Sequence, residues 1–98
     1  MADALYLPMK GIYFDQIMAG TKREEYRLAT AFWSRRLEGS RYSRIVLTRG
    51  YPKGGGTEGI NRLNLRWRGC TRKTIIHPFF VPAPVDVFAI DVTERIPF

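Results

Sequence analysis

Residues 13–28, YFDQIMAGTKREEYRL, change their hydrophobic period at a single glycine, and this change decides the first half of the fold. Ahead of Gly20, four apolar residues repeat at the spacing of one helical face: Tyr13, Phe14, Ile17 and Met18. Gly20 can end that helix because glycine readily adopts the left-handed conformation. From residue 22 to residue 28 the side chains alternate as they do along a strand. The stretch therefore predicts a helix, with its apolar face in the core, that turns directly into a strand.

The predicted strand carries a high density of charge. A period of two divides it into two faces: Arg23, Glu25 and Arg27 on one, and Glu24, Tyr26 and Leu28 on the other. Lys22 joins Glu25 only if the chain is still turning at residue 22. Such a strand either projects charged side chains into a cleft or pairs them with one another in a structural ladder of salt bridges.

Four further segments have the composition of strands: residues 5–9, 44–48, 62–68 and 85–92. We expect residues 71–76 to return as the hairpin partner of 62–68. Thr30 is a suitable N-cap for a second short helix, in which Trp33 and Leu37 share one face.

Length and composition indicate one globular domain. The chain has 98 residues, of which 45% are hydrophobic and 13% aromatic. We assign residues 1–98 to a single α+β domain of about five strands and two short helices, whose sheet closes into a small barrel. No run approaches the roughly 18 apolar residues of a membrane span, and no basic segment followed by an apolar one stands at the N-terminus. We expect a cytoplasmic protein without a membrane partner.

One cysteine and one histidine limit the chemistry of the chain. With Cys70 alone no internal disulfide can form, and together with His77 it cannot make a four-ligand zinc site. We expect no metal and no cofactor. A nucleophilic pair of Cys70 and His77 is conceivable, but the first follows a glycine and the second precedes a proline, where structural roles at loop edges are commoner.

The net charge of +7 is unevenly distributed. Residues 35–73 contain eleven Lys or Arg and two acids, which gives +9, whereas the rest of the chain has five basic and seven acidic residues, which gives −2. Arginine, whose planar guanidinium suits phosphate and base edges, supplies twelve of the sixteen cations. The middle of the chain therefore suggests a polyanion partner, the alternative being a solvated basic surface.

Residues 62–68 alternate clearly, with Leu63, Leu65 and Trp67 on one face. The opposite face carries three arginines, which we call the arginine row: Arg62, Arg66 and Arg68. Successive positions on one face of a strand are about 6.6 Å apart, near the spacing of successive phosphates. The row is therefore either a polyanion stripe or the solvated outer face of a sheet.

The order of these parts resembles the ASCH domain family. The resemblance rests on Pro8-Met9-Lys10, on the helix ending at Ala19-Gly20, and on the pattern Gly-x-Lys-x-x-Glu-x-Arg, here Gly20, Lys22, Glu25 and Arg27. The segment Arg49-Gly50-Tyr51 and the closing strand at 87–92 also fall where the family has comparable elements, whereas residues 53–80 match weakly. The resemblance implies a β-barrel related to the PUA domain of RNA-modifying proteins.

The resemblance also implies a function. The family is thought to bind RNA or nucleotides in a cleft beside this motif, some bacterial members remove the acetyl group of N(4)-acetylcytidine, and others are reported as ribonucleases. In the amidohydrolase branch a threonine stands at the position of Glu25 and a second glutamate comes from a distant segment, for which Glu58, in a glycine-rich loop, is a poor candidate. We expect an RNA- or nucleotide-binding module or, alternatively, a small hydrolase.

Each candidate residue has a chemical role to offer. If the protein is an enzyme, Lys22 acts as a base or an electrostatic catalyst beside Glu25, and the sign of any pKa shift of this lysine stays open. Glu25 either holds Lys22 or accepts a hydrogen bond, and Arg27 either pairs with phosphate or locks Glu25. The remaining candidates are stacking rings, rim cations and the arginine row: Tyr26 and Tyr51; Lys10 and Arg49; Arg62, Arg66 and Arg68. A protein-binding role for the basic surface is a third possibility, and the oligomeric state is not predicted.

Overall fold

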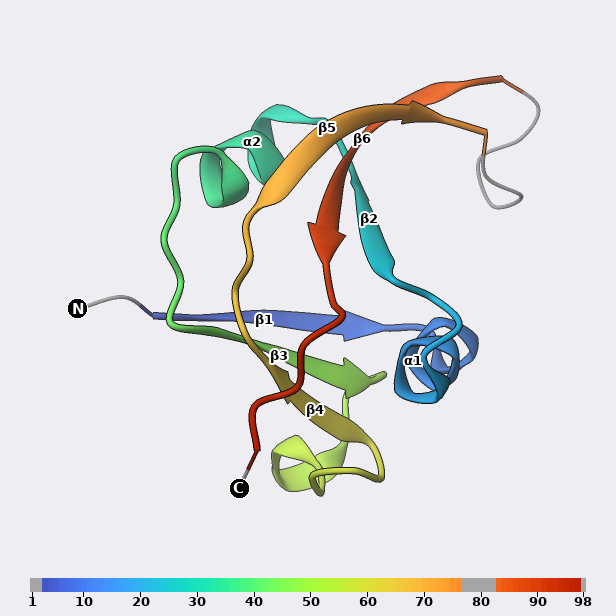
Figure 1. Ribbon diagram of the computed structural model, residues 1–98, viewed down its shortest axis with the longest axis vertical. Coiled ribbons are helices and arrows are strands. Elements are labelled where there is room, and N and C mark those ends of the chain that lie inside the picture. Colours follow the sequence, from blue (N-terminus) through green and yellow to red (C-terminus); the bar gives the residue numbers. More distant parts are fainter. Residues whose placement is uncertain (1–2, 77–82, 98) are drawn as a thin grey trace.

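A computed structural model describes residues 3–76 and 83–97 (Figure 1). Its elements in chain order are β1 (Ala4–Met9), α1 (Gly11–Ala19), β2 (Glu24–Leu28), α2 (Ala31–Leu37), β3 (Arg44–Arg49), the 3-10 helix η1 (Lys53–Gly55), β4 (Arg62–Leu65), β5 (Cys70–Ile75) and β6 (Val85–Asp91). The predicted α+β class is thus confirmed, with two α-helices and six strands in the described residues. No helix in this part of the chain has both the length and the apolar character needed to cross a bilayer.

The strands form two three-stranded sheets and not one closed barrel (Figure 1). The first has the order β1-β3-β4, with β1 parallel to β3, and the second is antiparallel in the order β2-β6-β5. On one side the chain after β6 connects them, because Arg66 donates its backbone N–H to Glu94 at 2.9 Å and Ile96 donates to Asn64 at 3.0 Å. No strand ladder of the described residues joins β1 to β2 on the other side.

Pro8 gives a physical reason for the open side. It lies in β1, an edge strand, and its carbonyl accepts a hydrogen bond from the Arg27 side chain at 3.1 Å. The N–H and C=O of one strand residue point to the same side. The donor that proline lacks is therefore missing on the edge that faces β2, which suits an edge strand and not a continuous ladder.

The core lies between the two sheets and under α1. Nine of its members are at most 1% exposed: Leu7, Phe14, Leu37, Ile45, Leu47, Leu63, Leu65, Phe88 and Ile90. Of the four apolar residues predicted for this core from the helix, Phe14 and Ile17 are buried, while Tyr13 and Met18 are partly buried and pack against it. Gly20 ends α1 with φ of 82°, as the sequence predicts.

Two strand predictions need correction. The strand expected over 62–68 ends at Leu65, because residues 94–96 take the free edge of β4 there and the chain then leaves the sheet. Residues 71–76 do not return as its hairpin partner. They belong to β5, which pairs with β6 in the other sheet after a turn at Gly69 with φ of 83°. The closing strand, in contrast, is confirmed as β6.

Two leucines test this core. Leu7 in β1 is 0% exposed and Leu28 in β2 is 40% exposed. We expect Leu7→Ala to lower the free energy of unfolding by about 3 kcal/mol, because it removes buried methylenes and leaves a cavity. Leu28→Ala should cost less than about 1 kcal/mol. Urea denaturation measures both, and equal losses would contradict the placement of β1.

Candidate functional site

A cleft of about 770 Å³ lies where the two sheets are not joined. It is lined from five places: the end of β1 and the residue after it, the helix α1, the turn before β2 and β2 itself, the helix α2, and the loop after β3. Its charged lining residues are Lys10, Lys22, Glu25, Arg27 and Arg36, and its aromatic ones are Tyr13, Tyr26, Phe32, Trp33 and Tyr51. The candidate motif of the sequence therefore faces a cleft.

A tight turn places Lys22 in this cleft. The backbone N–H groups of Thr21 and Lys22 both donate to the carbonyl of Gln16, at 3.0 and 3.1 Å, and β2 begins only at Glu24. The chain is thus still turning at residue 22, the condition under which Lys22 was expected to join Glu25. Its Nζ lies 3.9 Å from Glu25 Oε1.

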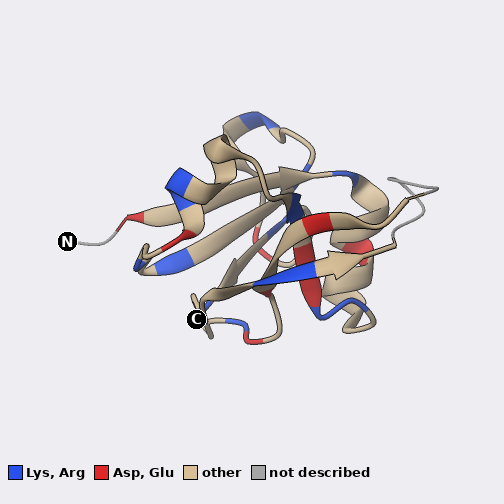
Figure 2. Cartoon of the chain, turned by 90° about the horizontal axis from the view of Figure 1, so that it is seen from above, with Lys and Arg blue, Asp and Glu red and all other residues tan. Residues whose placement is uncertain are grey.

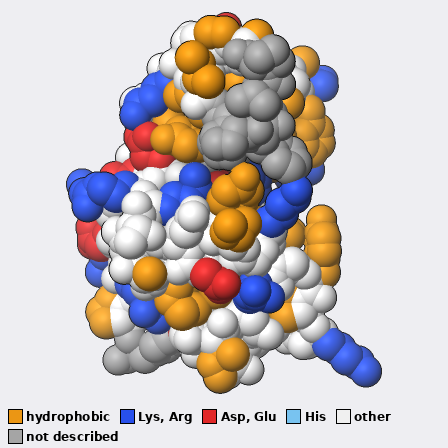
Figure 3. All heavy atoms as spheres, turned by 90° about the vertical axis from the view of Figure 1, so that its right-hand side faces the viewer, with side chains coloured by type: hydrophobic (Ala, Val, Ile, Leu, Met, Phe, Trp, Pro, Cys, Tyr) orange, Lys and Arg blue, Asp and Glu red, His pale blue; other side chains and the backbone are white. Residues whose placement is uncertain are grey.

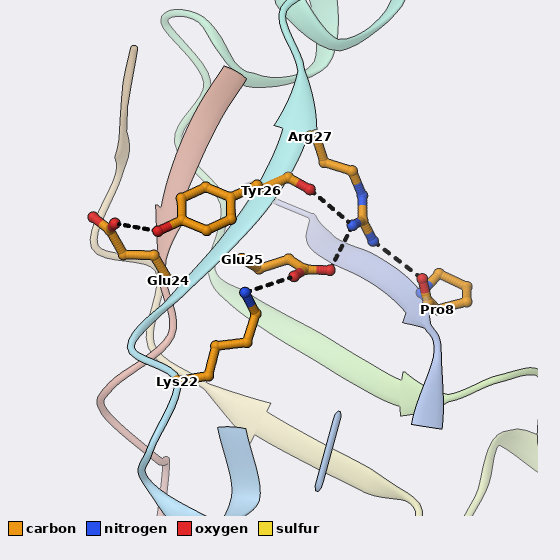
Figure 4. Close-up of polar contacts among 6 residues, drawn as sticks. All are labelled: Pro8, Lys22, Glu24, Glu25, Tyr26 and Arg27. Carbon is orange, nitrogen blue, oxygen red and sulfur yellow. Dashed lines mark hydrogen bonds and ion pairs between the residues drawn. The ribbon is translucent and has the colours of Figure 1, made fainter. Parts of the chain in front are cut away.

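Glu25 is 3% exposed and is the one buried charged residue in the described part of the chain. Arg27 Nη1 lies 2.5 Å from its Oε2 (Figure 4). The same guanidinium donates to the carbonyls of Tyr26 at 3.2 Å and Pro8 at 3.1 Å, and it lies 5.3 Å from the ring centre of Trp33. Of the two roles expected for Arg27, the structure shows the one that locks Glu25.

The Lys22 ammonium lies against aromatic rings, with Nζ 4.5 Å from the ring centre of Tyr26 and 5.3 Å from that of Tyr13. Burial lowers the pKa of Lys22 below its ordinary value, and the neighbouring carboxylates of Glu25 and Glu24 oppose that shift. The structure thus settles the sign left open by the sequence. A lysine of this kind is more readily deprotonated than one in water.

Tyr26 forms the border between the cleft and the surface beyond it. Its hydroxyl donates to Glu24 at 3.1 Å (Figure 4). Glu24 in turn pairs with Lys73 Nζ at 2.8 Å. Burial, followed by the hydrogen bond to Glu24, raises the pKa of Tyr26. The phenol is therefore held neutral, and its ring is fixed as one wall for Lys22.

Arg49 does not line the cleft, although the sequence placed it at the rim. Its Nε lies 3.2 Å from Asp15 in α1, and its guanidinium covers Gly11, where an added Cβ would lie 2.6 Å from Cζ. Asp15 raises the pKa of Arg49 further above its ordinary value. Lys10, Tyr26 and Tyr51, in contrast, do line the cleft as predicted.

The arginine row does not line the cleft either. Arg66 pairs with Glu94 at 2.6 Å, and Arg68 pairs with Glu94 at 2.8 Å and with Asp91 at 3.4 Å. Asp and Glu positions lie among the Lys and Arg positions along the chain (Figure 2). On the face seen in Figure 3, the basic side chains drawn in blue are separated by hydrophobic and acidic ones. The +9 of residues 35–73 therefore does not form one basic surface on that face.

Sequence reasoning missed the wall contributed by α2. Thr30 caps this helix as predicted, accepting from the N–H of Trp33 at 3.4 Å. Trp33, however, is partly buried against the core and not within it. Together with Phe32 and Arg36 it lines the cleft. Phe32 and Arg36 are four residues apart, a spacing that places two helical side chains together, and this was the available signal.

Comparisons with protein-family models, with curated proteins and with solved structures find no match to the chain. Within residues 3–76 and 83–97, no three His, Cys, Asp or Glu side chains gather in a way that could hold a metal ion. Cys70 is the first residue of β5, burial raises the pKa of its thiol, and His77 lies outside the described residues.

The ion pairs at the cleft floor differ in what they contribute to stability. We expect Glu25→Ala to lower the free energy of unfolding by about 3 kcal/mol, because it leaves the Arg27 guanidinium without its carboxylate. Lys22→Ala should cost less than about 1 kcal/mol, because the attraction over 3.9 Å is offset by the burial of the ammonium. Chemical denaturation compares the two. A loss of several kcal/mol for Lys22→Ala would show that Lys22 is a structural member of a salt-bridge ladder.

The lowered pKa of Lys22 makes stability depend on pH. Between the pKa of Lys22 in the folded chain and its ordinary value of 10.5, the unfolded chain binds more protons, so the free energy of unfolding rises with pH. The free energy of unfolding of wild type minus that of Lys22→Met should therefore rise as the pH increases toward 10.5. Lys73→Met is the control, because Glu24 raises the pKa of Lys73 and its contribution changes only above 10.5. A difference for Lys22→Met that is constant or falls would contradict the assignment.

Proposed function

We propose that the protein is an RNA- or nucleotide-binding module and that the cleft beside Lys22, Glu25 and Arg27 is its binding site. The observation that carries the proposal is the convergence of five aromatic rings, four cations and one buried carboxylate in a single cleft. Single-stranded nucleic acids are bound by this combination, in which bases stack on rings while cations hold phosphates.

The dimensions and rim of the cleft support the proposal. A volume of about 770 Å³ lies within the range of roughly 300–1,000 Å³ of small-ligand sites. Tyr51 is 89% exposed at its rim and offers a large ring face to a ligand. An aromatic side chain this exposed buries little of its apolar surface in the fold. A base stacked on the ring would bury that surface.

The resemblance of the sequence to the ASCH domain family is part of the same proposal. The four motif residues of the resemblance surround one turn, and three of them line the cleft. Two sheets joined along one side by residues 94–96 are compatible with an opened PUA-like barrel. These features support an ASCH-like site without depending on the arginine row.

A small hydrolase is the second candidate, and the state of Lys22 favours it. Because burial lowers the pKa of Lys22, a neutral amine is more accessible here, and such an amine can accept a proton from water or from a ribose hydroxyl. Glu58, the poor candidate for a second glutamate, is held by Asn64 at 2.6 Å and does not line the cleft. An acylated nucleoside such as N(4)-acetylcytidine and RNA itself are the substrates to consider.

Binding of a short single-stranded RNA at several salt concentrations tests the first candidate. Two to four phosphate contacts should give a slope of about −1.4 to −2.8 for log K against log salt. Fluorescence anisotropy measures this slope. Absence of binding, or binding with a slope near zero, would contradict the electrostatic part of the proposal.

Incubation with N(4)-acetylcytidine and with end-labelled RNA, followed by chromatography, separates the two candidates. Conversion that is lost in Lys22→Met but kept in Lys73→Met would support the hydrolase, because Lys73 is a lysine outside the cleft lining. If both substrates stay unchanged while RNA still binds, the hydrolase is contradicted and the binding module is supported.

A further inference from the structure

Two polar atoms at the cleft floor make no hydrogen bond with the described residues. Glu25 Oε2 accepts a hydrogen bond from Arg27, whereas Oε1 faces Lys22 Nζ at 3.9 Å, beyond hydrogen-bond distance. Lys22 in turn contacts the rings of Tyr26 and Tyr13 without any acceptor at hydrogen-bond distance. Neither atom is among the fully buried ones, and both residues line the cleft, so an acceptor and a donor stand side by side where a ligand can reach them.

The chemistry of these atoms defines the ligand edge that fits. A carboxylate oxygen only accepts and an ammonium only donates, so the ligand must present a donor next to an acceptor. The Watson–Crick edge of a nucleobase has this arrangement, with an amino or imino N–H beside a ring nitrogen or a carbonyl. In a duplex that edge is already paired.

A third contact lies on the α2 wall. The guanidinium of Arg36 lies 4.5 Å from the ring centre of Phe32, and both residues line the cleft. Arg36 has no carboxylate partner among the described residues, whereas Arg66 and Arg68 are paired with Glu94. Because the Arg36 guanidinium stacks on the Phe32 ring and has no carboxylate partner there, its N–H donors are available for a phosphate.

We infer that the cleft binds an unpaired nucleotide with its base pointing inward. The Watson–Crick edge of the base contacts Glu25 Oε1 and Lys22 Nζ, and the phosphate of the nucleotide contacts Arg36. The inference rests on the proposed function and deepens it. It fixes the orientation of the ligand, requires a single strand, and assigns phosphate recognition to α2 and not to the arginine row.

Nucleosides and their 5′-monophosphates, titrated separately and followed by NMR, test this orientation. Lys22→Met should weaken binding of nucleoside and nucleotide by the same factor, about tenfold, because it removes one charged hydrogen bond to the base. Arg36→Gln should leave the nucleoside affinity unchanged and reduce the preference for the monophosphate to near one. Arg95→Gln is the matched control. This exposed arginine pairs with Glu58 and does not line the cleft, and its replacement should change neither affinity.

Pairing of the strand gives an independent test. A short RNA should bind at least tenfold more weakly after annealing to its complement, although the duplex carries more charge. Equal or tighter binding of the duplex would overturn the inference. Loss of the phosphate preference in Arg66→Gln, and not in Arg36→Gln, would also overturn it.

The failure of the inference can be told apart from the failure of the proposed function. In both cases above, single-strand binding by the wild type still supports the proposed function. Wild-type protein that binds no nucleoside, nucleotide or RNA contradicts the proposed function itself. Thermal melts of each variant confirm that it is folded.

Discussion

The pair of Glu25 and Arg27 is the interaction on which both the fold and the cleft depend. Removing a carboxylate from water costs several kcal/mol unless a cation with good geometry and further hydrogen bonds offsets that cost. Arg27 meets this requirement at 2.5 Å, and its remaining donors reach the backbone of Tyr26 and of Pro8. The side chain that neutralises Glu25 thus also connects β2 to β1, on the side of the fold where no ladder of the described strands joins the two sheets. The floor of the cleft and the connection between the sheets are therefore the same set of contacts.

This arrangement also separates the roles of the two cations beside Glu25. Arg27 spends its donors on protein acceptors, so its charge serves the structure. Lys22 lies farther from the carboxylate and is held by ring faces, which attract a cation but do not satisfy its N–H groups. The lowered pKa of Lys22 and its unmade hydrogen bonds have the same cause, namely burial without a close acceptor. Binding and hydrolysis remain competing proposals because both draw on this one feature.

The sequence predicts what is encoded by neighbours along the chain. The change of period at Gly20 and the cap at Thr30 each depend on residues a few positions apart, and each is found, whereas the turn at Lys22 was left open by the sequence. The departure of Arg66 from the sheet depends on Glu94, and the pairing of β5 depends on β6, neither of which any local pattern reveals. The same limit explains the arginine row, in which Arg66 and Arg68 pair with acids that follow much later in the chain, Asp91 and Glu94. The α2 wall was missed for a different reason, because Trp33 packs on the core and also borders the cleft.

The open side of the fold links sequence to function most directly. Had β1 paired with β2, a ladder of backbone hydrogen bonds would occupy the space between them, and side chains of the turn and of α2 would have no cleft to line. Pro8 removes one backbone donor from that edge, and Arg27 replaces the ladder with a side-chain contact to the Pro8 carbonyl. Arg27 bonds only Oε2 of the neighbouring carboxylate, and Oε1 faces Lys22 at 3.9 Å in the cleft. The incomplete closure of the two sheets is therefore the structural condition for a site that can accept a donor and offer one at the same place.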